Sequence, residues 1–290
     1  MSDVRARALQ TLSGVLWLFR LKNRLAVASL YVIIALVILA AGASLFAPYN
    51  PSEISNSPLL PPSSHHLFGT DYLGRDVFSQ VIFGMRITLL VGFCAGMISL
   101  VIGAFAGAYA GYHGGLVDAA LMRLTDALMT IPGFLLLIVV AAIYGGSITT
   151  EILVIGLTIW PPLARITRAE FLSLKTRQFV EASKLAGASS THLIWREILP
   201  NAAPPIIAST SLRIGSAMFA EASLSFLGLG DPQFLSLGQL MNYAIDYLGV
   251  AWWIMIFPGL FLIVTVLAFN LLGNGITDAL NPALARVKMR

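Results

Sequence analysis

The chain has 290 residues, of which 57% are hydrophobic and only 11% are charged, and its formal net charge is +4. An average soluble domain has about 25% charged residues, so a soluble protein of this composition would expose large apolar patches. The basic residues lie in short stretches between apolar runs, which is typical of membrane topology and argues against a nucleic-acid-binding surface. The composition therefore predicts an all-α membrane protein in a lipid bilayer, with no nucleic-acid partner.

Six segments are apolar and long enough to cross the bilayer core as helices, which takes about 20 residues. In chain order they are 25–46, 87–109, 116–144, 148–163, 202–228 and 251–272. The third and the fifth carry charges, and the fourth is short and ends at Pro161-Pro162. Pro132 and Pro258 are expected to kink or interrupt the third and the sixth, because proline removes a helical hydrogen bond. The sequence thus predicts six transmembrane helices.

The lysines and arginines orient these spans. They gather before the first span, between the fourth and the fifth, and after the sixth: Arg5, Arg7, Arg20, Lys22, Arg24; Arg165, Arg168, Lys175, Arg177, Lys184, Arg196; Arg286, Lys288, Arg290. With six spans these three clusters share one side, which the positive-inside rule assigns to the cytoplasm. We therefore expect a multi-pass protein of the inner membrane with both termini in the cytoplasm.

This orientation divides the chain into five parts. They are a cytoplasmic segment 1–24, a first transmembrane helix 25–46, an external loop 47–86, a five-helix core 87–280 with a cytoplasmic segment 165–200, and a cytoplasmic tail 281–290. Ala41-Gly42-Ala43 could be a signal-peptide cleavage site. The long basic leader and an apolar run beyond the usual 7–15 residues favour a retained span instead.

Glycines and charges within the spans suggest close packing and buried polar groups. The second span carries Gly92, Gly96, Gly103, Gly107 and Gly111, mostly four residues apart and therefore on one helix face. Such a face allows a neighbouring helix to approach closely, either as ordinary packing or as a sliding surface in a moving transporter.

The single cysteine, Cys94, cannot form an intrachain disulfide.

Four charged residues fall in or near the spans, where charges are costly and usually face protein or water. Arg123 and Asp126 are three residues apart and are expected to form a local ion pair or to reach the interface. Arg213 and Glu221 lie about two turns apart on roughly the same face. These two residues are the candidates for side chains that face a transport pathway.

The segment 165–200 predicts two short helices joined by a tight turn. The first runs up to Gly187, since glycine tolerates the left-handed conformation that ends many helices. A serine or threonine at 189–191 can cap the second, and Pro200 ends that helix or begins the fifth span. Ala182 and Ala186 form a stripe of small residues beside Glu181, which could seat in a groove of a partner protein. The alternative is an amphipathic loop lying on the membrane.

The same segment resembles the EAA loop of ABC importer permeases. The resemblance rests on Glu181-Ala-Ser, Gly187 and Leu199-Pro200, with Ser183 in place of the usual second alanine. Glu197 stands where the pattern often has an aliphatic residue. Four further stretches are similar to the C-type permeases of dipeptide, oligopeptide and nickel importers: Leu67–Asp76, Gly84–Ile87, Ala222–Gly230 and Asn270–Gly275, the last followed by Asp278.

The resemblance implies a type I ABC importer permease fold with a cytoplasmic coupling helix that docks into an ATPase. The implied coupling residues are Glu181, Ala182, Ser183, Ala186, Gly187, Leu199 and Pro200. It also implies four kinds of partner: a homologous second permease, two ABC ATPase subunits, an extracytoplasmic solute-binding protein and a peptide substrate. Such a chain is non-catalytic and carries no cofactor or metal, and the sequence contains no Gly-x-x-x-x-Gly-Lys-Ser/Thr phosphate loop.

Several alternatives remain open at this stage. Within the family the substrate could be nickel or glutathione in place of a di- or oligopeptide. Outside the family, a secondary transporter driven by an ion gradient would fit the apolar spans, although the two repeated halves typical of that class are not visible. An intramembrane enzyme needs a nucleophile beside a base, and all four histidines lie in loops or near span ends.

Overall fold

The computed structural model describes residues 24–55 and 57–280, and this part of the chain is helical, with Thr70–Asp76 as its one isolated bridge. The long helices are α2 (Arg24–Ala41), α4 (Val77–His113), α11 (Leu199–Phe226) and α13 (Trp253–Leu280). Two bent pairs are α5 (Gly115–Thr130) with α6 (Gly133–Tyr144), and α7 (Ile148–Ile159) with α8 (Pro161–Leu174). The short helices are α3 (Ala43–Phe46), α9 (Gln178–Leu185), α10 (Ser190–His192) and α12 (Leu237–Tyr243), with a π-helical turn at Leu193–Ile198 and a 3-10 turn at Ile245–Tyr247.

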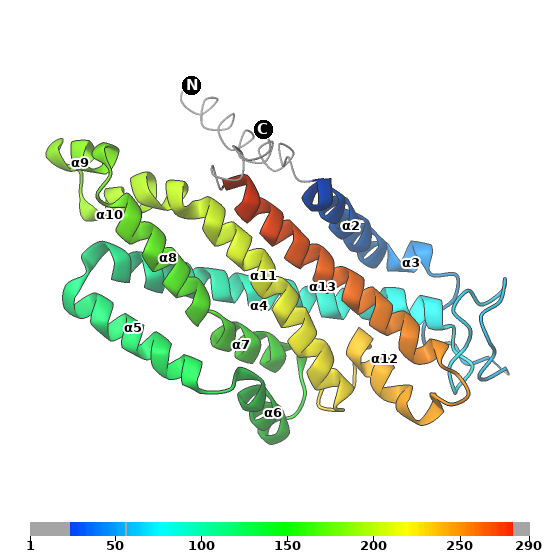
Figure 1. Cartoon of the computed structure of the whole chain (residues 1–290). Helices are drawn as coiled ribbons and strands as arrows, with labels where there is room; N and C mark the ends of the chain where they lie inside the picture. The colour runs from blue at the N-terminus through cyan, green and yellow to red at the C-terminus, as the bar shows by residue number, and fades with distance from the viewer. Residues whose placement is uncertain (1–23, 56, 281–290) are drawn as a thin grey trace.

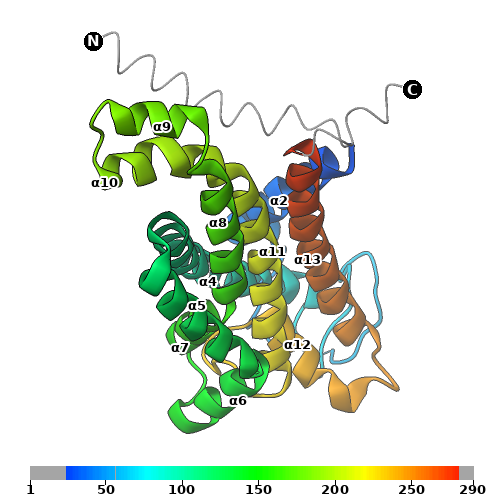
Figure 2. The same cartoon turned by 60° about the vertical axis from the view of Figure 1, so that its left-hand side comes forward.

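The helix α11 lies at the centre of the bundle, packed against α4, α8 and α13, while α2 packs on α13 (Figure 1). Figure 2 shows α9 and α10 at the same end as the start of α2 and the end of α13, with α6 and α12 toward the opposite end. The basic clusters at Arg5, Arg7, Arg20, Lys22, Arg286, Lys288 and Arg290 lie outside the described residues. Arg24 and the basic residues of segment 165–200 lie within them.

Three helices, α2, α4 and α13, are each long and apolar enough to cross a membrane, and the bent pairs raise the number to five within the described residues. The bend is 73° between α5 and α6 and 42° between α7 and α8. The helix α11 has 28 residues, a length of about 42 Å at 1.5 Å per residue, but it contains Arg213, Glu221 and two internal prolines. A span count of six, with α11 included, stays a prediction.

Two helix boundaries differ from the expected ones. The helix α4 begins at Val77 rather than near Ile87, because Asp76 caps it and the charge of Arg86 is satisfied inside the helix bundle. The Arg86 guanidinium donates from Nε to Ala40 O at 2.5 Å and from Nη2 to Ala41 O at 2.9 Å, two carbonyls at the end of α2. The first helix ends there, and α3 follows after Gly42.

The prolines behave differently in the two spans where an interruption was expected. Pro132 separates α5 from α6, which confirms the break in the third span. Pro258 lies inside α13, which continues unbroken to Leu280, so the expected interruption of the sixth span was wrong. The fourth span bends at Trp160 and continues as α8 to Leu174, well past the expected end near residue 163.

The glycine face of α4 provides its close contacts. A Cβ at Gly103 would lie 2.9 Å from the Leu163 side chain, and a Cβ at Gly107 would lie 2.5 Å from the Thr167 side chain, both on α8. At Gly92 and Gly96 the neighbours are Met218 and Ile214 of α11. The small-residue face therefore packs α4 tightly against α8 and α11, as close helix approach in membranes requires.

Candidate functional site

The turn that ends α9 has the left-handed glycine that the sequence predicts. Gly187 has a φ of +84°, and its N–H donates to Lys184 O at 3.0 Å. The next N–H, of Ala188, donates to Ser183 O at 3.1 Å. These two bonds form a Schellman motif, which satisfies the last carbonyls of α9. A Cβ on Gly187 would meet nothing within 4 Å, so glycine is required here by the backbone conformation and not by crowding.

A helix cap after the turn and a buried side chain of α9 hold this turn against the helix bundle. Ser189 caps α10 by accepting from the His192 N–H at 3.3 Å, which confirms the predicted serine cap. Beneath it, Val180 of α9 packs in one buried cluster with Phe171 of α8 and with side chains of the π-helical turn and α11. The coupling segment is therefore attached through its buried face to α8 and α11.

Pro200 begins α11, one of the two roles predicted for it. Because proline has no N–H, the turn before it is wider, and the Leu199 N–H donates back to Ile194 O. The Asn201 side chain donates from Nδ2 to Glu197 O at 2.6 Å. The helix α10, the π-helical turn and α11 therefore follow one another without a break, whereas the turn at residues 186–189 separates them from α9.

Most of the predicted coupling residues face outward. Glu181, Ala182, Ala186, Gly187 and Pro200 are exposed, while Ser183 and Leu199 are half-buried.

Leu185 adds a feature that the motif did not indicate, because its side chain is 90% exposed at the end of α9. Covering a leucine contributes about 1.5–3 kcal/mol, so this surface is suited to a protein partner. The sequence could have indicated the exposure of Leu185, because residue 185 lies on the opposite side of the helix from Val180.

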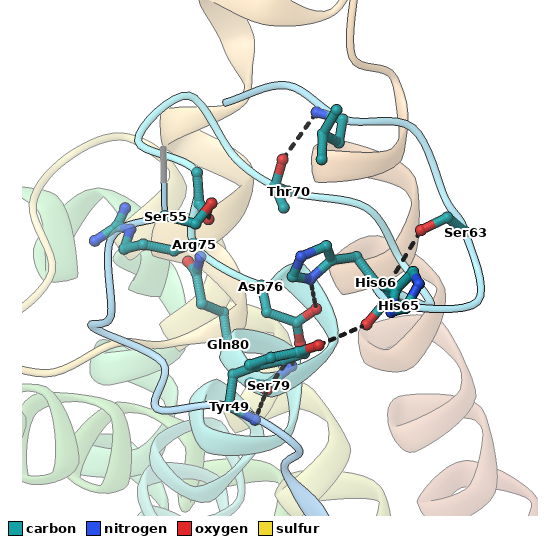
Figure 3. A network of polar contacts seen from close by, with 12 residues as sticks. Tyr49, Ser55, Ser63, His65, His66, Thr70, Arg75, Asp76, Ser79 and Gln80 are labelled. Atoms are coloured by element: carbon teal, nitrogen blue, oxygen red, sulfur yellow. Dashed lines mark hydrogen bonds and ion pairs between the residues drawn. The ribbon is translucent and has the colours of Figure 1, made fainter. Parts of the chain in front are cut away.

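A network of polar contacts joins segment 47–76 to the start of α4 (Figure 3). Asp76 caps α4, with Oδ2 accepting from the Ser79 N–H at 2.8 Å, and its Oδ1 lies 2.9 Å from His66 Nδ1. The Tyr49 ring packs on His66 with centroids 4.9 Å apart. His66 therefore serves the helix cap.

Asp71 holds the turn before α4 through both oxygens of its carboxylate. Its Oδ1 accepts from the N–H groups of Leu73 and Arg75. Its Oδ2 accepts from Arg75 Nε at 2.6 Å and from Gln80 Nε2 at 2.9 Å. The Trp253 Nε1–H donates to Thr70 O at 3.1 Å and so fastens the segment to α13.

The charges of the third span pair with α8 and not with each other. Asp126 accepts from Arg165 Nη2 at 2.5 Å, so the expected local pair with Arg123 was wrong. Asp118 accepts two hydrogen bonds from Arg168, at 2.5 and 2.6 Å. These ion pairs fasten α5 to α8, whereas Arg123 is exposed.

Arg213 and Glu221 have different surroundings, although both lie on α11. Arg213 lines a cavity of about 490 Å³ between α5, α6, α7 and α8. Glu221 is 0% exposed and accepts from Ser225 Oγ at 2.9 Å. Glu151 of α7 is a further buried carboxyl, 2% exposed, which no motif in the sequence indicated. Of the two predicted pathway residues, Arg213 is the one that borders open space.

Comparison with known proteins gives two family matches. The family described as binding-protein-dependent transport system inner membrane component matches residues 99–286. The N-terminal TM domain of oligopeptide transport permease C matches residues 15–62.

Individual relatives match over nearly the whole chain. It is 39% identical to the dipeptide transport system permease protein DppC of Bacillus subtilis, over 91% of this chain and 84% of that protein. It is 36% identical to the oligopeptide permease OppC of the same organism, over 91% and 87%. It is also 36% identical to the glutathione transport system permease protein GsiD of Pectobacterium atrosepticum, over 97% and 94%.

Among solved structures, a chain of the MetNI methionine ABC transporter in an inward-facing conformation matches with a TM-score of 0.57 and 22% identity. The match covers 70% of this chain and 97% of that one. At this identity the likeness shows the fold, that of an ABC importer permease.

Proposed function

Since the chain belongs to the family of binding-protein-dependent transport system inner membrane components, we propose that it forms half of the translocation pathway of an ATP-driven importer of di- or oligopeptides. The relatives named for dipeptide and oligopeptide transport support this substrate class. Glutathione, itself a peptide, is the substrate named for another relative and is the alternative within the family.

The exposed α9 carries the proposal. Its outer face presents Glu181, Ala182 and Ala186, and the exposed Leu185 follows at its end. Its inner face is fixed to α8 and α11 through Val180. A helix with one face anchored in the bundle and the other free is suited to dock in a groove of an ATPase. Two ABC ATPase subunits, one under each permease, would move such helices when they bind ATP.

The movement would reach the pathway through α11. This helix continues directly from α10 and the π-helical turn, and Arg213 lies on it beside the cavity. The second anchor, α8, borders the same cavity at Pro162. Because Val180 packs against both α8 and α11, a displacement of α9 would move these two helices and so change the walls of the cavity.

A second homologous permease would cover the α5–α6 pair. Along these two helices only Thr125, Leu137 and Ala141 are buried. The exposed face includes Arg123 and the Arg165–Asp126 pair, which lipid alone would not solvate. Protein or a water-filled pathway on this face would remove that cost. A secondary transporter that works as a single chain would have no second subunit to cover these charges, so the exposed face disfavours that alternative.

The proposed orientation places α9 and both termini in the cytoplasm of a multi-pass inner-membrane protein. Four basic residues lie between the end of α8 and the start of α11: Lys175, Arg177, Lys184 and Arg196. The helix α9 in this stretch is at the same end of the bundle as the start of α2 (Figure 2). The segment 47–76 and α12 would then face outward, where an extracytoplasmic solute-binding protein delivers substrate.

Affinity purification of the tagged chain in mild detergent tests the assembly. The expected result is co-purification of one homologous permease and two ATPases, together with peptide uptake that depends on ATP and on a binding protein. Recovery of the chain alone, with uptake driven by an ion gradient, would contradict the proposal and favour a secondary transporter. The variant Gly187→Asp serves as the control, because it should weaken ATPase recovery without affecting the second permease.

A further inference from the structure

The cavity beside Arg213 lies where both bent helix pairs change direction. Ile131 and Gly133 line it from the break between α5 and α6, and Ile159 and Pro162 line it from the bend between α7 and α8. Its volume of about 490 Å³ is within the 300–1,000 Å³ range of small-molecule sites. Broken membrane helices that meet at a cavity are a usual framework for substrate sites in transporters.

The wall of this cavity is apolar except at two side chains, Arg213 and Thr158. The buried Nε of Arg213 has no hydrogen-bond partner, and no carboxylate in the described part of the chain pairs with the guanidinium. By contrast, Arg165 and Arg168 on neighbouring α8 each pair with an aspartate. A guanidinium in apolar surroundings requires a counter-charge, and here none comes from the described residues.

The N-terminus of α6 adds to the positive potential. Gly133, its first residue, borders the cavity, and no side chain caps this end. The first N–H groups of a helix have no intrahelical partner and favour an anion. Thr158 donates its hydroxyl hydrogen to Ile155 O at 2.9 Å, so its oxygen remains available only as an acceptor. The cavity thus offers a cation, one acceptor and an apolar wall, and the uncapped start of α6 lies at its border.

We propose that this cavity binds the C-terminal carboxylate of the transported peptide, with Arg213 as its partner and the apolar wall around the adjoining side chain. This inference rests on the proposed function. A carboxylate can accept two parallel hydrogen bonds from a guanidinium, and the apolar surroundings strengthen that bond. The Thr158 oxygen can accept from the terminal amide N–H of the peptide. A phosphate of an anionic lipid would share the chemistry of the head group, and the test below separates the two.

The test is ATP-driven uptake by the full transporter in proteoliposomes, with its binding protein. Two substrates are compared, a tripeptide with a free carboxylate and the same tripeptide as its C-terminal amide. The affinity of the binding protein for each is measured separately, and uptake is compared at equal loading. The variants are Arg213→Gln, Arg213→Lys and the control Arg24→Gln, which removes an exposed arginine at the start of α2 that does not line the cavity.

Arg213→Gln is expected to lower uptake of the free acid about tenfold, the loss of a hydrogen-bonded charge pair, and uptake of the amide less than about twofold. Arg213→Lys should keep most of the preference for the free acid, and Arg24→Gln should leave that preference unchanged. Because lysine keeps the charge, Arg213→Lys gives the answer even if the glutamine variant fails to assemble. The proposal would be overturned if the ratio of amide uptake to free-acid uptake were the same for Arg213→Lys as for Arg213→Gln.

Other outcomes would also overturn it. One is an equal loss for acid and amide in Arg213→Gln. Another is an Arg213→Gln variant whose ratio of amide uptake to free-acid uptake is unchanged but which no longer co-purifies with an anionic phospholipid detected by mass spectrometry. That result would assign the cavity to lipid. If the unmodified transporter imports neither peptide with ATP, the proposed function fails and this inference with it. If it imports both and the ratio never responds to Arg213, only this inference fails.

Discussion

Two segments that connect spans both depend on glycine turns, yet they are built in opposite ways. One is segment 47–76, proposed to be external, and the other runs from α9 to the π-helical turn and is proposed to couple to the ATPase; they are called the external and the coupling segment below. In the external segment the carboxylates of Asp71 and Asp76 are 2% exposed and fully engaged by partners within this chain. In the coupling segment Glu181 and Leu185 face outward. The external segment is complete by itself, whereas the coupling segment leaves its outer face for another protein.

The largest effect should follow from Asp76→Ala, which tests whether the external segment is self-sufficient. The substitution removes the cap of α4 and leaves His66 Nδ1 and the Ser79 N–H without their acceptor. A lost cap and unsatisfied buried groups together should lower the free energy of unfolding by about 3 kcal/mol. The measurement is the thermal unfolding midpoint in detergent, with proteolysis of segment 47–76 as a second readout.

Glu53→Ala is the control for Asp76→Ala, because Glu53 is an exposed acid of the same segment. It should leave both readouts unchanged. If the two variants were equally stable, the network around Asp76 would not be what holds the segment.

The two segments also differ in how far the sequence predicts them. At the coupling segment the decisive interactions are local: Gly187 ends α9, and Ser189 caps α10 three residues before its bonding partner. Short-range patterns therefore predicted both helices and the turn. The folded state of the external segment depends on His66 and Asp76, ten residues apart, and on Trp253, far along the chain. Asp71 and Asp76 look alike in sequence, and only the fold assigns the cap to the second.

The same distinction applies inside the membrane. The charge of Arg213 could be noted in the sequence, but its cavity requires four other helices to be in place. Asp126 has Arg123 three residues away, and yet it bonds Arg165 on α8. The break at Pro132 and the continuity at Pro258 differ because surrounding helices determine whether a proline is accommodated.

A smaller effect is expected from substitutions at Gly187. They test docking to the ATPase, measured as uptake, and not the stability of the chain. Gly187→Asp and Gly187→Asn have side chains of nearly the same shape, and both residues tolerate a positive φ better than most. Only aspartate adds a charge to the docking surface. Aspartate should lower ATP-driven uptake at least about tenfold, since an unpaired charge at an interface is costly, while asparagine should lower it much less.

Uptake and the amount of chain in the membrane are measured together for both Gly187 variants. Equal uptake by the two would show that the turn conformation alone matters and would remove the docking role of Gly187. A loss of the chain from the membrane in either variant would place the coupling segment among the parts that the fold itself needs.

The smallest effect should come from Leu185→Ser, compared with Leu116→Ser. The two leucines are 90% and 89% exposed, and Leu116 lies in the first turn of a different helix, α5. Neither substitution should change the unfolding midpoint, because an exposed side chain contributes within about 0.5 kcal/mol. Leu185→Ser alone should weaken ATPase binding, by about threefold, as expected for one apolar contact beside an interface centre.

Binding is measured by titrating the purified ATPase onto the membrane subunits in detergent. If Leu116→Ser weakened it as much as Leu185→Ser, the exposed face of α9 would have no special part in docking. If Leu185→Ser lowered the unfolding midpoint as Asp76→Ala is expected to do, Leu185 would contribute to the fold of this chain. The external segment, whose buried carboxylates bond within this chain, and the coupling segment, whose outer face is proposed to bind the ATPase, would then no longer differ in this way.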